Sequence, residues 1–272
     1  MYHAAIQRLD EAASAFHDAG LLREKQECFY LAGQFQNKLL AESPYGPQPR
    51  FMHQQWVWAL GHIGLLHQYL RATDPASIVV LFAPGSANNQ FLSAILDRFH
   101  NLKMVWPMPA VSCDAAMRNA VYFGCPDGRS TLVDYNKSIE RQFKGQGLLK
   151  LTNRQNLLCK ALMENLRISH PYIALQPRNV LSDPARNVTK TQIMEAINRF
   201  PGHDIVVTGI DPHDLSFASV HTCEDPREAS FLLSANCDQF IGSNSGAWVI
   251  PHAYGKPVHI INDHQRSAWI YD

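Results

Sequence analysis

The sequence of 272 residues has no excess of charge of either sign, because 24 Lys and Arg residues balance 24 Asp and Glu residues. This balance excludes the broad basic field that drives non-specific binding to nucleic acids, although a small phosphate-bearing ligand needs only local charge. Long apolar runs are also absent: the stretches at 78–83 and 248–251 are far shorter than the roughly 20 residues of a membrane-spanning helix. We therefore expect no membrane span and no nucleic-acid partner.

The N-terminus lacks the basic segment and apolar stretch of a secretory signal, which favours a cytoplasmic protein. The six cysteines are scattered without the close spacing of zinc or redox motifs, so we expect reduced and mostly buried thiols. The closest histidine pairs, His62/His67 and His259/His264, are each five residues apart, which does not place two rings on one helix face. We predict no metal site and no resident cofactor.

The first 50 residues form a separate predicted region. Apolar side chains in residues 1–42 recur at helical spacing that is broken at Gly20, which predicts two antiparallel helices. The segment 43–50 contains three prolines and a glycine, which cannot continue a helix and favour an extended linker. We predict a helical hairpin and linker over residues 1–50.

Beyond the linker, apolar strands alternate with helices, as in parallel sheets covered by helices. In residues 51–147 we predict strands at 54–60, 78–82 and 103–105, a turn at 61–64, helices at 65–71 and 88–99, and irregular chain from 107 to 147. In residues 148–272 we predict strands at 172–175, 204–208, 239–241 and 257–261, and helices at 152–166, 189–200, 227–235 and 246–254. The predicted fold class is α/β, with two Rossmann-like parallel-sheet domains.

The sharpest candidate site is the turn Gly242-Ser243-Asn244-Ser245-Gly246, which follows a predicted strand and opens a predicted helix. Glycines permit a tight turn, hydroxyls donate hydrogen bonds, and the first amides of a helix attract anions. The turn lacks the Lys of a Walker loop, the glycine spacing of a dinucleotide fingerprint, and a Ser at the centre of a nucleophile elbow. A phosphate-binding turn and a helix start capped by Ser243 or Ser245 fit equally well.

A second candidate follows the predicted strand 172–175. The planar guanidinium group of Arg178, beside Asn179, can donate hydrogen bonds to two oxygens of a diphosphate. Arg186, slightly downstream, could add a donor, although an exposed arginine in a loop is the simpler interpretation.

A third candidate is His62, which lies between Gly61 and Gly64 in the first predicted turn. Imidazole titrates near neutrality and can take a proton from a hydroxyl acceptor, so His62 is a candidate general base. A histidine with a purely structural role is an equally good interpretation.

Several segments resemble a family of bacterial glycosyltransferases that is related in form to GT-B enzymes such as the nodulation fucosyltransferases. In the second half the similar segments are Tyr172-Ile-Ala-Leu-Gln-Pro-Arg-Asn179, which matches the family's Leu-His-x-Arg strand end, Phe240-Ile-Gly-Ser-Asn-Ser-Gly246, and Ile250-Pro-His-Ala-Tyr-Gly-Lys-Pro-Val258 with Asn262. In the first half they are Gly61-His62-Ile63-Gly64 and Ala87-Asn-Asn-Gln-Phe-Leu92. Their order along the chain matches that of the family.

The resemblance implies a GT-B-like fold and metal-independent transfer of a hexosyl- or fucosyl-type sugar from a nucleotide diphosphate to a hydroxyl. The partners would be a nucleotide sugar and a glycan, lipid or protein acceptor. The residues implied are His62 as the catalytic base, Gly61 and Gly64 in an acceptor-side turn, and Arg178, Asn179, Ser243, Asn244, Ser245 and Gly246 as donor-binding residues.

The sequence departs from the family pattern in two places. The strand-end His of the family is Gln176 here, and the sequence stops soon after Ile261, which leaves open a truncated C-terminal domain. Two alternatives therefore remain. One is a non-catalytic scaffold of GT-B form that binds a partner through the helical hairpin, and the other is a nucleotide-sugar epimerase or hydrolase.

Overall fold

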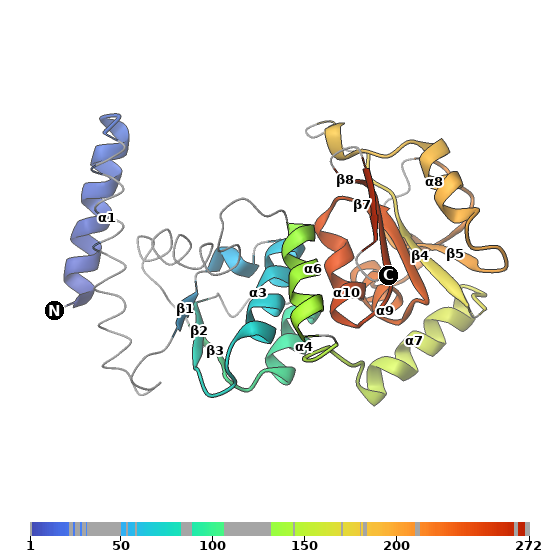
Figure 1. Ribbon diagram of the computed structural model, residues 1–272, viewed down its shortest axis with the longest axis horizontal. Coiled ribbons are helices and arrows are strands. Elements are labelled where there is room, and N and C mark those ends of the chain that lie inside the picture. The colour runs from blue at the N-terminus through green and yellow to red at the C-terminus, as the bar shows by residue number, and fades with distance from the viewer. Residues whose placement is uncertain are drawn as a thin grey trace. The chain divides into compact units, whose positions relative to one another are not determined.

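A computed structural model divides the chain into two compact units, residues 1–135 and 136–272 (Figure 1). The sequence predicts that the first sheet domain ends at residue 147, whereas the first unit ends at residue 135. The structure describes residues 2–21, 24, 28, 31, 50–52, 54–57, 59–82, 89–105, 132–143, 145–169, 171–179, 181, 184–209, 213–263 and 266–269.

The first unit holds a parallel sheet with the strand order β1-β2-β3. Its elements are α1 (Tyr2–Asp18), β1 (Arg50–Met52), the 3-10 helix η1 (Gln54–Val57), α3 (Leu60–Ala72), β2 (Val79–Phe82), α4 (Gln90–Arg98) and β3 (Leu102–Val105). Asn89 caps α4, because its side chain accepts hydrogen bonds from the Phe91 and Leu92 amides. The second helix of the predicted hairpin, apart from residues 24, 28 and 31, lies outside the described residues.

The start of this unit differs from the sequence prediction. The first strand is residues 50–52, within and just after the predicted linker, whereas residues 54–57 form η1 rather than a strand. Trp56 is buried because it packs against Tyr69 of α3, with ring centroids 6.4 Å apart. Short buried strands and short buried helical turns have similar apolar sequences, so residue types alone cannot distinguish them.

The second unit holds a sheet with the strand order β6-β5-β4-β7-β8-β9, in which β9 alone runs antiparallel to its neighbour. Its helices and 3-10 helices are α6 (Leu132–Phe143), which begins in the first unit, α7 (Asn153–Asn165), η2 (Pro184–Arg186), α8 (Lys190–Ile197), η3 (Val220–Thr222), α9 (Pro226–Asn236), η4 (Gly246–Trp248) and α10 (Val249–Ala253). Its strands are β4 (Tyr172–Gln176), β5 (Asp204–Val207), β6 (Ala218–Ser219), β7 (Gln239–Ser243), β8 (Val258–Asp263) and β9 (Arg266–Trp269). The first five strands have the order of a Rossmann half.

Helices cover both faces of this sheet (Figure 1). Successive side chains of a strand point to opposite faces and so contact the helices on each side. On one face, Ile173 and Leu175 join a buried cluster with Ile193 of α8. On the other face, the Tyr172 hydroxyl donates to the Leu233 carbonyl oxygen of α9 at 2.8 Å. The α/β class with Rossmann-like parallel sheets is therefore confirmed.

Local sequence signals explain where two of the helices begin. Thr152 precedes α7 and Thr189 precedes α8, and each hydroxyl accepts from the amide three residues later. The side chains of Gln155 and Gln192 accept in turn from the threonine amides, which completes two capping boxes. Each box satisfies helix-end amides that would otherwise have no partner.

Apart from β1 and the short 3-10 helices, one α-helix and two strands of the described residues were not predicted. Residues 132–143 form α6 inside the segment expected to be irregular, while residues 106–131 lie outside the described part of the chain. The strands β6 and β9 contain two and four residues, too few to show a period. The predicted helix 246–254 is a 3-10 turn that continues into the five residues of α10.

Four cysteines lie in the described residues, and none of them forms a disulfide. Cys28, Cys159 and Cys237 are buried. Burial raises the pKa of the Cys237 thiol to about 12, so this sulfur stays protonated and unreactive at neutral pH. In the part of the chain that the structure describes, no helix has the length and apolar character needed to span a membrane.

His259 of β8 should make the unit less stable in acid. Burial, together with nearby Arg199, lowers the pKa of its imidazole to about 4, against 6.5 for the unperturbed side chain. Below pH 6.5 the His259 imidazole binds a proton in the unfolded chain but not in the native one. The free energy of unfolding therefore falls as the pH is lowered, until the native ring also protonates near pH 4. The loss reaches about 2 kcal/mol by pH 5.

Urea unfolding at pH 7 and pH 5 measures this loss. A His259→Leu variant should lose about 2 kcal/mol less between these pH values than the native sequence does. His221→Ala removes an exposed histidine and is the matched control. An unchanged pH dependence in His259→Leu would show that this imidazole does not carry the effect.

Candidate functional site

The candidate site lies at the carboxyl ends of β4 and β7. β4 is the first strand of the second sheet, the chain moves outward from it to β5 and β6, and it then returns to place β7 on the opposite side. Connections to the two sides of β4 therefore leave the sheet in opposite directions. Open parallel sheets bind their ligands at this kind of switch point.

Gln176 links the two strand ends. It pairs with Gly242 of β7 in the sheet, and its side-chain oxygen accepts a hydrogen bond of 3.1 Å from the Ser245 hydroxyl. A Cβ atom on Gly209, which follows β5, would lie 2.9 Å from the Cγ of Gln176. The glutamine side chain therefore lies at the ends of three adjacent strands.

The serines of the turn do not act as helix caps. Ser245 occupies the N-cap position of η4, but its side chain makes no capping hydrogen bond. Ser243 belongs to β7, is 1% exposed, and its hydroxyl has no hydrogen-bond partner among the described residues. Ser245 is therefore the N-cap residue that one interpretation predicts, but its side chain makes no capping bond. In this conformation Ser243 lies beneath the surface that a ligand would touch.

The loop after β4 is fastened at both ends. The Arg178 carbonyl oxygen accepts from the Val188 amide at 3.1 Å, and the Asn187 side chain donates to the Asn179 side-chain oxygen at 3.2 Å. Asn262, at the end of β8, donates to the Asn187 carbonyl oxygen at 2.6 Å. These bonds hold the half-buried Arg178 beside the strand ends.

Arg186 of η2 also reaches this site. Its guanidinium donates to the carbonyl oxygen of Asn244 at 3.2 Å, which ties the loop after β4 to the turn after β7. From the sequence we expect an exposed loop arginine at this position. No local signal could have revealed the contact, because 58 positions separate the two residues and their meeting depends on the strand order.

His62, Gly61 and Gly64 lie in the first unit. They do not form a turn between strand and helix, as predicted, but belong to the first turns of α3. The His62 amide donates to the Ala59 carbonyl oxygen at 3.0 Å and its residue is exposed, while Gly64 is buried. The apolar run before Gly61 suggested a strand, and this moved the predicted helix start to residue 65.

The gathered side chains offer hydrogen-bond donors to an anion. Arg178 and Arg186 carry guanidinium groups, and Gln176, Asn179 and Ser245 carry amide or hydroxyl groups. Guanidinium groups can bind two oxygens of a phosphate at once. Among the residues that the structure describes, no group of three or more His, Cys, Asp or Glu side chains could hold a metal ion.

Comparison with known proteins gives a structural similarity but no match in sequence. No protein-family model matches the chain, and no curated protein does. A solved structure of the ADP-heptose LPS heptosyltransferase II of E. coli is similar, with a TM-score of 0.43 and 14% sequence identity. The similarity covers 77% of this chain and 82% of that one.

Proposed function

We propose that the protein is a metal-independent glycosyltransferase, which moves a sugar from a nucleoside diphosphate to a hydroxyl group of an acceptor. The observation that carries the proposal is the contact of Gln176 with Ser245, together with that of Arg186 with Asn244, at the ends of β4 and β7. The segments that contain these strand ends are also those that resemble glycosyltransferases.

The chemistry of sugar transfer fits these groups. As the bond between the anomeric carbon and the diphosphate breaks, negative charge grows on the departing phosphate oxygen. Arg178 and Arg186 would stabilise this charge through the N–H donors of their guanidinium groups. The Gln176 side-chain NH2 group, oriented by the Ser245 hydroxyl that donates to the Gln176 side-chain oxygen, would add a neutral donor.

The acceptor hydroxyl attacks the anomeric carbon and must lose its proton. His62 would take this proton as the general base, in the first turn of α3. Gln176 stands where the resembled family has a histidine. Because an amide does not titrate at physiological pH, Gln176 would orient the donor rather than transfer protons.

Thermal unfolding with a panel of nucleotides tests donor binding. GDP, UDP and ADP are compared, with CMP as the monophosphate control. A diphosphate at 100 times its Kd should stabilise the native state by about 2.7 kcal/mol, which raises Tm by about 5–10 °C. Arg178→Ala should abolish the shift, whereas Arg154→Ala, on the exposed side of α7, should retain it.

Other outcomes would favour the alternatives. No shift with any nucleotide would contradict the proposal and favour a non-catalytic scaffold. A selective shift followed by release of free sugar from the matching nucleotide sugar, even with acceptors present, would indicate a hydrolase. Sugar joined to an acceptor would support transfer.

A further inference from the structure

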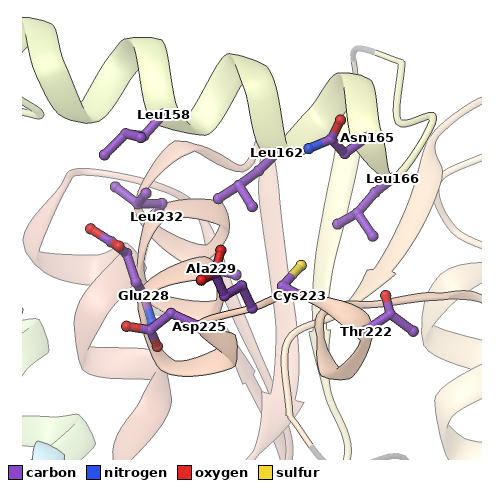
Figure 2. A pocket seen from close by; sticks show the side chains of 11 residues that line it. Leu158, Leu162, Asn165, Leu166, Thr222, Cys223, Asp225, Glu228, Ala229 and Leu232 are labelled. Atoms are coloured by element: carbon purple, nitrogen blue, oxygen red, sulfur yellow. The ribbon is translucent and has the colours of Figure 1, made fainter.

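The second unit carries an open groove that shares no residue with the candidate site. The groove has a volume of about 780 Å³ and lies between α7, α9 and η3 (Figure 2). Figure 2 shows Leu158 and Leu162 projecting from α7 toward α9, where Leu232 meets them. Its floor is therefore built from aliphatic side chains of two helices.

The apolar surface continues outside the groove along α7. Leu158 is 37% exposed and the neighbouring Leu157 is 69% exposed. Two adjacent exposed leucines on a helix leave apolar surface in contact with water, and such surface marks interaction sites when it lies beside a groove. An occupant confined to the groove would leave Leu157 uncovered, so the extent of the surface favours a macromolecular partner.

Carboxylates border the same groove. Glu224, Asp225 and Glu228 all line it, from the segment before α9 and from its first turn. Asp225 caps α9 by accepting from the Arg227 and Glu228 amides. Within the described part of the chain, none of these three carboxylates forms an ion pair with a Lys, Arg or His side chain. The border is thus acidic, although the whole chain is neutral.

We propose that this groove binds a basic amphipathic helix of a partner protein. The apolar stripe of the helix would cover the leucines of α7 and α9, and its Lys or Arg side chains would face Glu224 and Glu228. Grooves between helices receive amphipathic helices in this manner. Opposite charges at the border would set the orientation of the partner and speed its association.

A fluorescein-labelled peptide of about 14 residues, in which lysines flank a helical stripe of leucines, is a suitable probe for fluorescence anisotropy. The native sequence should bind it, whereas Glu224→Lys/Glu228→Lys should weaken binding at least tenfold. The matched double variant Asp97→Lys/Glu195→Lys makes the same change of net charge outside the groove and should bind as the native sequence does. Asp225 is left unchanged because it caps α9.

A charge exchange tests the pairing directly. A second peptide with glutamates in place of the lysines should bind Glu224→Lys/Glu228→Lys better than it binds the native sequence. Glu224 is exposed and Glu228 is half-buried, and neither belongs to the core, so the variant should fold. Its Tm verifies this.

Three results would overturn the proposal. The first is equal binding of the lysine peptide by the native sequence and by Glu224→Lys/Glu228→Lys. The second is equal binding of a scrambled peptide whose leucines do not share one face. The third is a dimer in sedimentation equilibrium that Glu224→Lys/Glu228→Lys dissociates, which would assign the groove to a second copy of this chain. None of these measurements involves nucleotides, so their failure and that of the glycosyltransferase proposal are distinguishable.

Discussion

Arg178→Ala should lower kcat for sugar transfer by about 100- to 1000-fold. Removing one donor that is aimed at developing negative charge costs this much where the site is preorganised and partly screened from water. The bonds from Val188 to the Arg178 carbonyl and from Asn187 to Asn179 use none of the Arg178 side-chain atoms. The loop should therefore keep its shape when the side chain is shortened.

Release of the nucleoside diphosphate, from the donor that the thermal panel selects, measures this effect. Arg154→Ala removes an exposed arginine of α7 and should leave kcat unchanged. His62→Ala should also slow the reaction if the imidazole is the general base. Normal turnover by both Arg178→Ala and His62→Ala would contradict the proposed function.

Gly242→Ala should lower the free energy of unfolding by about 3 kcal/mol, near the upper end of the usual cost of overpacking. An added Cβ would lie 2.8 Å from the Cε1 of Phe240 and 3.2 Å from the backbone oxygen of Gln176. Phe240 is fully buried, and the Gln176 oxygen is fixed in the sheet, so neither neighbour can withdraw. Tm should fall by about 6–12 °C.

Gly209→Ala provides the comparison for this loss. Its added Cβ would meet only the side chain of Gln176, at 2.9 Å from Cγ, and a flexible side chain can rotate away. We expect a loss of stability below about 1 kcal/mol, together with weaker nucleotide binding because Gln176 leaves Ser245. Equal losses of stability in the two variants, measured by urea unfolding, would show that the Phe240 contact does not decide the cost.

Local chemistry made much of the second unit predictable. Thr152 and Thr189 are each followed three residues later by the glutamine that completes a capping box. Four adjacent positions therefore specify the start of each helix. The strands β4 and β7 are apolar runs followed directly by polar or glycine residues. These runs predicted the turn after β7 and the arginine after β4 as candidate site residues. They did not show that the two segments lie at the same edge of the sheet.

The remaining features depend on contacts between distant positions. Gln176 meets Ser245 across 69 positions, and only the strand order brings them together. The error at residues 54–64 has a different origin, because Trp56 is buried by packing against α3 and not by a sheet. The apolar residue types of this segment correctly predicted that it is buried. They did not show whether a sheet or a helix covers it.

The strand order of the second sheet has a consequence during synthesis. β4 becomes the centre of the sheet, yet residues 177–238 separate it from its neighbour β7. At ordinary rates of translation a ribosome needs roughly 3–12 s to add these 62 residues. During that interval β4 can pair only with β5, once β5 has been made, so at least one edge of β4 displays unpaired backbone groups to any extended chain nearby. A nascent chain with this order of strands is therefore a natural client for chaperones that shield exposed strand edges.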